Sequence, residues 1–266
     1  MSGHTIRIAA LAAAVALALP ASASAHHKHR PWRVTSSTVL GHHVVAASYL
    51  PGHRVRLRAA GTGHALRTPL IWGSRVRAVA AMNADTWTWG GAMPVGATRV
   101  EGHWVHKPRR GAKLWTRPAV GFLHTGRIVF GAKMAVRHNA ANIISGPAYL
   151  IRGGVVQHSY PWAHNSQINC GLRYSGHRGC YRSNVVRFKS GRVGMVEVAF
   201  ADMLETAKIL KRMGVVDALT FDSGGSAVLG YRPGLHHAWA QFGVNHHFRL
   251  GYLRAVPDAV CMEVGR

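Results

Sequence analysis

The feature that most constrains the fold is a series of short β-rich segments joined in pairs by glycine turns. Four such pairs occur, and glycine tolerates the backbone angles that a tight reversal requires. Together they predict hairpins in an antiparallel sheet system. The paired segments are 44–50 and 55–57 around Pro51 and Gly52, 119–123 and 128–130 around Gly126, 149–151 and 155–157 around Gly153 and Gly154, and 185–188 and 193–198 around Gly191.

One segment, residues 202–213 (DMLETAKILKRM), departs from this pattern and predicts a helix. Its apolar residues recur at helical spacing. Asp202 and Glu205 stand three apart, as an N-cap residue and its capping-box partner do. Gly214 follows at the position where a glycine in the left-handed conformation often ends a helix.

The predicted helix lies between predicted strands 193–198 and 216–221, which favours a β-α-β unit with parallel strands and a right-handed crossover. Asp222 would then stand at the carboxyl end of a strand, where open α/β sheets usually present their ligands. The expected fold class is therefore α+β, a mixed and largely antiparallel sheet built from glycine-turn hairpins with a C-terminal β-α-β unit.

The N-terminus has the pattern of a secretory signal peptide. A short basic start, an apolar run over residues 8–20 and small residues over 21–25 predict cleavage after Ala25 and a secreted or cell-surface protein. The apolar run is too short to span a bilayer. We expect residues 26–40 to be a flexible basic lead-in and residues 41–266 to form a single domain.

The chain is strongly basic, with 33 Lys and Arg residues against 9 Asp and Glu residues and a formal net charge of +24. Such a field concentrates anions near the protein. For an exported protein, these are phosphorylated glycans, anionic wall polymers or exopolysaccharides and membrane surfaces, rather than a specific nucleic acid. The alternative is that the charge reflects only an arginine-rich composition. Charge leaves the chemistry and the oligomeric state open.

Two of the three cysteines, Cys170 and Cys180, flank a short loop rich in Gly and Arg. In an oxidising compartment they are expected to form a disulfide worth roughly 2–3 kcal/mol by chain entropy. A metal site at these two cysteines lacks a matching second pair of ligands. Cys261 is interpreted as a buried thiol.

A carboxylate and two glycines follow the last predicted strand, in the sequence DSGGS over residues 222–226. Glycines let the backbone approach a ligand closely and direct several N–H groups at it. The alternative is a turn in which Asp222 caps the next segment. The sequence also resembles the nucleophile motif of trypsin-like proteases, with Ser223 as the nucleophile. We reject that interpretation because Phe221 replaces a glycine and no upstream segment supplies the family's histidine.

Five segments in order resemble the phosphodiester glycosidase domain family, over roughly residues 79–229. They are residues 81–87 (AMNADTW), Pro94 to Gly96 with Gly102, residues 146–153 (GPAYLIRG), residues 182–186 (RSNVV) and residues 213–226 (MGVVDALTFDSGGS). The sequence departs from the family pattern at three places. Ser223 replaces the first glycine of a glycine triplet, residues 85–87 (DTW) replace Gly-Phe-Phe, and Val186 stands where the pattern usually has a glycine.

The resemblance implies hydrolysis of a sugar linked through phosphate, with catalytic residues Asp222, Asn83 and Arg182. A phosphodiester leaves as an anion, so one carboxylate and a cation would suffice in place of the usual two carboxylates. Arg182 would bind the phosphate through its planar fork, and Asn83 would orient a sugar hydroxyl or phosphate oxygen. The expected substrate-binding residues are Gly224, Gly225, Ser226, Asp85 and Gly146.

Each of these roles has a structural alternative. Asn83 could pin a turn, Arg182 could pair with Asp217, Ser226 could cap a helix and Asp85 could hold a loop. Glu197, within a strand, either faces solvent or supplies a second carboxylate. No cofactor is predicted, and a divalent cation stays open. Adjacent histidines on a strand point to opposite faces and seldom share a metal, so they are interpreted as polar surface, with His246 or His247 as a candidate border of the site.

Two functions are therefore carried forward. The first is an exported hydrolase that cleaves a glycosyl-1-phosphodiester or a related wall or exopolysaccharide linkage. The second is a non-catalytic exported protein that binds anionic cell-surface polymer on the same fold.

Overall fold

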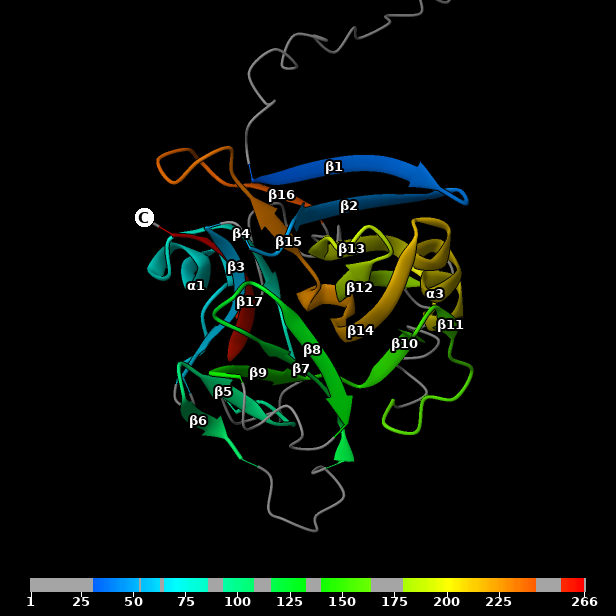
Figure 1. Ribbon diagram of the computed structural model, residues 1–266, viewed down its shortest axis with the longest axis horizontal. Coiled ribbons are helices and arrows are strands. Elements are labelled where there is room, and N and C mark those ends of the chain that lie inside the picture. The colour runs from blue at the N-terminus through cyan, green and yellow to red at the C-terminus, as the bar shows by residue number, and fades with distance from the viewer. Residues whose placement is uncertain are drawn as a thin grey trace, which may run out of the picture. The chain divides into compact units, whose positions relative to one another are not determined.

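The computed structural model describes residues 31–52, 54–62, 65–85, 93–107, 116–132, 140–163, 179–242 and 255–265, which all belong to one compact unit, Pro31–Arg266. In this part of the chain the strands form three sheets, and every paired strand is antiparallel to its neighbour. The fold is thus mainly β, with two α-helices among the described residues (Figure 1). No described helix is long and apolar enough to cross a membrane.

The first sheet has seven strands and carries most of the candidate site. In spatial order its strands are β1 (Trp32–Val39), β2 (His42–Tyr49), β13 (Val193–Ala201), β12 (Cys180–Phe188), β14 (Val215–Ser223), β10 (Ala148–Arg152) and β11 (Val155–Val156). Strands β2, β12, β13 and β14 are almost entirely buried. They lie at the centre of the sheet, where both faces are covered.

The second and third sheets have five strands each. The second runs β16 (Ala240–Phe242), β15 (Leu229–Tyr231), β4 (Ala78–Asn83), β17 (Asp258–Val264) and β3 (Val55–Gly61). The third runs β6 (His103–His106), β5 (Thr98–Val100), β9 (Asn142–Ser145), β7 (Pro118–Phe122) and β8 (Ile128–Ala132). All three sheets contribute apolar side chains to one core, which includes Val185, Leu219, Met82, Val260 and Phe122.

Three of the four predicted hairpins are present. Strand β7 pairs with β8, β10 with β11 and β12 with β13. Gly126, Gly154 and Gly191 have φ angles of 78°, 81° and 79° in the connecting turns. Each is a conformation that a side chain would strain, so the glycines fix where these chains reverse.

The fourth predicted hairpin, between residues 44–50 and 55–57, is wrong. Both strands exist, but β2 pairs with β1 and β13 while β3 pairs with β17 in the second sheet. Tyr49 helps to fix this change of sheet, because its hydroxyl donates to the carbonyl of Gly126 over 2.6 Å and accepts from the amide of Leu57 over 3.1 Å. The turn therefore connects two sheets.

The expectation of a flexible lead-in over residues 26–40 is wrong for residues 32–39. These form strand β1, which pairs with β2 along its whole length from Trp32 to Val39. Apolar and polar residues alternate only weakly in this segment, so its own sequence does not indicate a strand. Its extended conformation depends on pairing with β2. The predicted signal peptide lies outside the described residues and stays a prediction.

The predicted helix is confirmed as α3 (Met203–Arg212). The side chain of Asp202 accepts from the amide of Glu205 over 2.7 Å, and the Glu205 side chain accepts from the amide of Asp202 over 2.9 Å. Gly214 follows with a φ of 82°. The helix buries Met203 and Leu210 in a second core on the first sheet.

Strands β13 and β14, which α3 connects, each pair antiparallel with β12, and so they run in the same direction. They are not neighbours, because β12 lies between them. The parallel pair expected from the sequence is thus split by an antiparallel strand. The inserted strand is β12, the hairpin partner of β13, and sequence spacing does not indicate on which side of β13 its partner lies. The handedness of the crossover stays a prediction.

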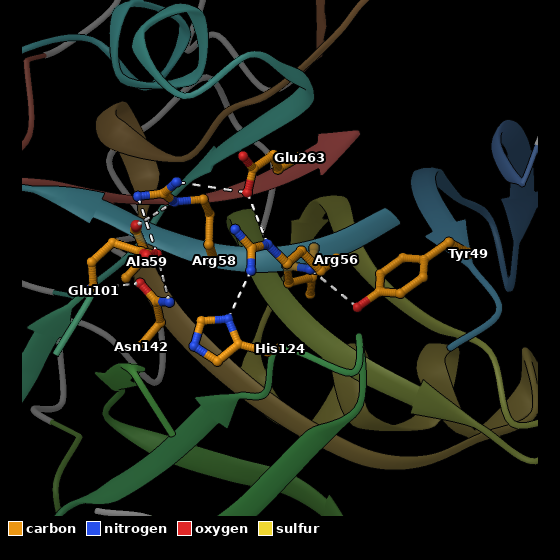
Figure 2. Close-up of polar contacts among 9 residues, drawn as sticks. Tyr49, Arg56, Arg58, Ala59, Glu101, His124, Asn142 and Glu263 are labelled. Carbon is orange, nitrogen blue, oxygen red and sulfur yellow. Dashed lines mark hydrogen bonds and ion pairs between the residues drawn. The ribbon is translucent and has the colours of Figure 1, made fainter. Parts of the chain in front are cut away.

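A polar network joins the second sheet to the third (Figure 2). Arg56 on β3 donates to Glu263 on β17 over 2.9 Å, and Arg58 pairs with Glu101 at 3.2 Å. Asn142 on β9 also donates to Glu101, over 2.9 Å. Burial alone would raise the pKa of Glu101, but the Asn142 hydrogen bond and the charge of Arg58 lower it. The ionised carboxylate thus holds the turn between β5 and β6 against β3 and β9.

Helix α1 (Pro69–Arg75) covers the second sheet near its β4 and β17 strands. Thr68 caps its first turn by accepting from the amide of Ile71 over 3.3 Å. Trp72 is buried beneath it, and its indole N–H donates to the carbonyl of Val256 over 3.1 Å. The helix closes the side of the second sheet that faces away from the main core.

Candidate active site

Asp222 is the next-to-last residue of β14, and it marks the point where that strand reaches the surface. The preceding residues are buried, whereas Asp222 and Ser223 are partly exposed. The Asp222 amide donates to the carbonyl of Ala84 over 3.0 Å, and the Ser226 hydroxyl donates to the Asp222 carboxylate. The carboxylate is therefore held in place on a partly exposed residue, as a group acting on a bound substrate requires.

Asn83 ends β4 and is fully buried beside Asp222. Its Nδ2 donates to the main-chain carbonyl of Asp222 over 3.1 Å, and its Oδ1 accepts from the amide of Val228 over 3.1 Å. The Ser183 hydroxyl also donates to Asn83 Oδ1. Asn83 thus fixes the main chain on both sides of the turn that carries Asp222.

Arg182 on β12 lies beside the same turn. Its Cα is in register with that of Ser223, and its Nε donates to the carbonyl of Ala201 over 2.8 Å. Burial lowers the pKa of Arg182 to about 10, although the charges of Asp202 and Glu205 at the start of α3 oppose this shift. Arg182 remains a cation at neutral pH, placed on the α3 side of the first sheet.

A β-bulge shapes the turn. Asn184 lies opposite Thr220 and Arg182 lies opposite Ser223, so that Ser183 alone faces the two residues Phe221 and Asp222. Bulges of this kind change the direction of the side chains that follow them. As expected for successive residues of a strand, Ser183 contacts Asn83 of the second sheet while Arg182 contacts the α3 side. Asn83 and Arg182 therefore approach the end of β14 from opposite faces.

The predicted glycine turn follows immediately as a short 3-10 helix, Gly224–Ser226. Gly224 has a φ of 75°, a value that favours glycine. Gly225 lies in the same turn, and Ser226 is buried with its hydroxyl directed at Asp222. The hydroxyl of Ser226 thus orients the Asp222 carboxylate, which differs from the helix-capping alternative.

Asp85 is buried and holds the architecture around it. Its carboxylate accepts from the amide of Gly96 over 2.7 Å and from the hydroxyl of Ser145 over 3.1 Å, and pairs with Arg117 at 2.9 Å. These contacts support the alternative in which Asp85 holds a loop. Arg117, which the sequence did not single out, also donates to the carbonyl of Gly146 over 3.2 Å.

Gly146 has a packing reason to be glycine. A Cβ at this position would lie 2.2 Å from the carbonyl oxygen of Thr220 on β14. The main chain of residue 146 therefore lies directly against the strand that carries Asp222. Gly146 supports the site through this close approach.

Two further polar residues, Glu197 and Ser183, lie near the site. Glu197 is fully buried, and so the alternative in which it faces solvent is wrong. Its Oε2 lies 2.6 Å from the Ser183 hydroxyl oxygen, which in turn contacts Asn83. Residues 183 and 197 are directly opposite one another on β12 and β13, a register that only the hairpin between them could have indicated.

The other residues that the sequence singled out are an aspartate, the three cysteines and two histidines. Asp217 accepts from Arg187 over 2.9 Å rather than from Arg182. Cys261 is a buried free thiol, as predicted, and burial raises its pKa to about 12. Cys180 is buried at the start of β12, but Cys170 lies outside the described residues and the disulfide stays a prediction. His246 and His247 also lie outside the described residues.

The described part of the chain contains no group of three His, Cys, Asp or Glu side chains placed to hold a metal ion. The polar side chains that the fold brings to the end of β14 are a carboxylate, an amide and hydroxyls, with a guanidinium on the opposite face. This set can orient a polar substrate and stabilise charge next to a carboxylate.

Comparison with known families and structures bears on this site. The sequence model of the family described as phosphodiester glycosidase matches residues 76–263, which include every residue discussed above at the end of β14. No curated protein sequence matches the chain significantly.

Several solved structures have the same fold. The catalytic domain of zebrafish N-acetylglucosamine-1-phosphodiester alpha-N-acetylglucosaminidase, auto-inhibited by its pro-peptide, is 15% identical with a TM-score of 0.66, covering 90% of this chain and 85% of that one. A hypothetical protein from Synechocystis is 14% identical with a TM-score of 0.67, covering 87% and 61%. A putative exported protein from Burkholderia pseudomallei is 13% identical with a TM-score of 0.52, covering 84% and 74%.

Proposed function

Because this chain belongs to the phosphodiester glycosidase family, we propose that it is an exported hydrolase that cleaves the bond between a sugar and a phosphodiester. The observation that carries the proposal is the convergence of two residues from different sheets. Asn83 on β4 fixes the main chain of Asp222 on β14, and the Asp222 carboxylate lies at the partly exposed end of that strand.

The reaction replaces the bond from the anomeric carbon to the phosphate oxygen with a bond to water. The electron pair of the broken bond stays on the phosphate, which leaves as a phosphomonoester, and the proton lost by water is taken up by a base or by solvent. Since the phosphodiester is a weak base, its departure needs no prior protonation. One carboxylate can then stabilise the positive charge at the anomeric carbon, act as nucleophile or activate water. We assign the single catalytic carboxylate, in whichever of these three roles it acts, to Asp222.

The residues around Asp222 supply orientation and charge. The Ser226 hydroxyl holds the carboxylate, and the amides of Gly224 and Gly225 in the 3-10 turn are the proposed donors to an anionic oxygen. Arg182, expected from the family resemblance to bind the phosphate, is fully buried on the opposite face beside Ser223, so we propose that it acts through its positive charge and not by direct contact with the phosphate. Asn83 acts through the main chain that it holds.

The substrate class follows from the family and from the charge of the chain. The zebrafish structural relative is named for an N-acetylglucosamine-1-phosphodiester, which makes this sugar diester the first compound to test. A formal net charge of +24 favours anionic polymers such as phosphorylated glycans of the cell surface. Asp85 and Gly146, which the resemblance predicts to bind substrate, are proposed instead to hold the backbone around the site.

Phosphorus NMR of the purified protein with N-acetylglucosamine-1-phosphodiester tests the proposal. Hydrolysis converts the diester signal to a monoester signal and releases free sugar in equal amount. The Asp222→Asn variant should fold normally and lose this conversion. Conversion by Asp222→Asn at the rate of the unaltered protein would remove Asp222 from the reaction.

One observation favours a second candidate, a non-catalytic protein that binds anionic surface polymer. Ser223 stands where the family pattern has a glycine, next to Asp222. This candidate predicts binding to anionic polymer that weakens at high salt and is the same for the unaltered protein and Asp222→Asn. A binding isotherm at low and high salt, measured beside the NMR assay, distinguishes the two functions.

A further inference from the structure

Glu197 is a buried carboxyl group in the middle of the first sheet, and the proposed reaction does not use it directly. It lies on β13 opposite Ser183 on β12, with Val45 of β2 on its other side. Its side chain is fully inaccessible to solvent. From Glu197, a chain of hydrogen bonds passes through the Ser183 hydroxyl to Asn83 and then to the main chain of Asp222.

The orientation of the Asn83 amide is fixed by two main-chain groups. The Asp222 carbonyl accepts, so the atom beside it must be the donor Nδ2, 3.1 Å away. The Val228 amide donates, so the atom beside it must be the acceptor Oδ1, also at 3.1 Å. Because the carboxamide has one donor end and one acceptor end, these two contacts exclude the flipped orientation.

The Ser183 hydroxyl must therefore give its proton to Asn83. Asn83 Oδ1 carries no hydrogen, and the Ser183 oxygen lies within hydrogen-bond distance of it. A hydroxyl has only one proton, so Ser183 cannot also donate to Glu197 Oε2, which is 2.6 Å away. Two oxygen atoms at that distance require a hydrogen between them, and it must come from the carboxyl group.

We propose that Glu197 is a protonated carboxylic acid that donates from Oε2 to Ser183 and thereby positions Asn83 and the main chain of Asp222. The hydrogen bonds run in one direction across four strands, from Glu197 on β13 to Ser183 on β12, to Asn83 on β4 and to the carbonyl of Asp222 on β14. Glu197 is thus a positioning residue. Its effect on catalysis rests on the proposed function, whereas its protonation does not.

The surroundings of Glu197 agree with a neutral group. Burial raises its pKa well above the ordinary value, and the opposing effects of the Ser183 hydrogen bond and the Arg182 charge are smaller. The other titratable group on β12 that acts on it is Tyr181; β2 presents Val45 and β4 presents Asn83. In the part of the chain that the structure describes, Glu197 Oε1 has no hydrogen-bond partner, which a buried carboxylate anion would tolerate poorly.

Infrared spectroscopy tests the protonation without any substrate. At pH 7 the unaltered protein should show the carbonyl band of a buried carboxylic acid, and this band should persist when the pH of the solvent is changed. Glu197→Gln should lack the band. Asp258 is a second buried carboxyl group with a raised pKa, so the difference spectrum against Glu197→Gln is needed to assign the band. A difference spectrum that shows only loss of carboxylate bands would overturn the proposal.

Kinetics test the positioning role. Glutamine can donate to Ser183 from its amide nitrogen, so Glu197→Gln should keep kcat within about threefold, whereas Glu197→Leu and Ser183→Ala should lower kcat by about tenfold or more with KM little changed. If Glu197 were instead a second catalytic carboxylate, Glu197→Gln would lose as much activity as Asp222→Asn. If the protein hydrolyses no sugar phosphodiester, the proposed function fails while the infrared result still decides the state of Glu197.

Discussion

The Nδ2 atom of Asn83 donates to the main-chain carbonyl of Asp222 over 3.1 Å, joining the last residue of β4 to the carboxyl end of β14. The two residues are far apart in the sequence and belong to different sheets. The same amide accepts from Val228, which follows the turn. The position of the Asp222 carboxylate therefore depends on how the second sheet packs on the first.

Replacing Asn83 should destabilise the protein. Asn83→Ala leaves the carbonyl of Asp222 and the amide of Val228 buried without their partner, and each unsatisfied group costs about 1–3 kcal/mol. Urea unfolding measures the loss. Gln157→Ala, which removes an exposed amide, is the control and should change stability by less than about 0.5 kcal/mol. Equal effects of the two variants would contradict the anchoring role of Asn83.

The stability of the protein should depend on pH through Glu197. Burial raises the pKa of Glu197 in the folded state. Below the unfolded pKa both states hold the proton and the stability is full; above it the unfolded chain loses the proton first, and stability falls as pH rises towards the folded pKa. The slope is up to about 1.4 kcal/mol per pH unit.

Glu197→Gln lacks this dependence, since glutamine does not titrate. The free energy of unfolding of Glu197→Gln minus that of the unaltered protein should therefore increase as pH rises from about 5 to 8. Denaturant unfolding at a series of pH values gives the difference, in which the contributions of other groups cancel. A difference that stays constant between about pH 5 and 8 would mean that Glu197 is ionised in the folded protein over this range.

The buried ion pair between Arg117 and Asp85 should contribute strongly to stability. Both side chains are almost inaccessible and lie 2.9 Å apart. Arg117→Met leaves the Asp85 carboxylate without this cation, and the loss of one partner of a buried pair costs about 3–5 kcal/mol. Adding Asp85→Asn to Arg117→Met should recover part of the loss in urea unfolding. Additive losses from the two substitutions would show that the pair does not interact.

Gly146→Ala should destabilise the first sheet. The added Cβ would lie 2.2 Å from the carbonyl oxygen of Thr220, and the shift needed to relieve this contact costs about 1–3 kcal/mol. Because Thr220 lies two residues before Asp222, the variant should also lose activity in proportion to the displacement of β14. An unfolding temperature of Gly146→Ala equal to that of the unaltered protein would contradict this prediction, because it would mean that β14 shifts away from the added Cβ without loss of stability.

Local features of the fold could be predicted because their causes lie close together in the sequence. The capping box of Asp202 and Glu205 fixes the start of α3 within one turn, and glycines at positions 126, 154 and 191 fix three reversals. The hairpin predicted at Pro51 is wrong because nothing local distinguishes a hairpin turn from a turn that connects two sheets. That distinction depends on β13 and β17, which pair with the two strands from far along the chain.

The site was predictable only in part. The family resemblance indicated Asn83, Arg182 and Asp222, and the structure places all three at the end of β14. The sequence did not indicate that Arg182 and Ser183 serve opposite faces of the first sheet, because a bulge and the burial of both faces obscure the alternation. Long-range packing alone brings Arg117 to Asp85 and Asn83 to Ser183, whereas Ser183 meets Glu197 through the register of the β12–β13 hairpin.

The central claim is that the carboxylate of Asp222 acts in hydrolysis of a sugar phosphodiester, and kcat/KM for N-acetylglucosamine-1-phosphodiester tests it most directly. Asp222→Asn should lower kcat/KM by about 100-fold or more, while Asp217→Asn, which removes a carboxylate from the same strand at the Arg187 ion pair, should stay near the unaltered value. A folded Asp222→Asn protein with kcat/KM equal to that of Asp217→Asn would contradict the claim.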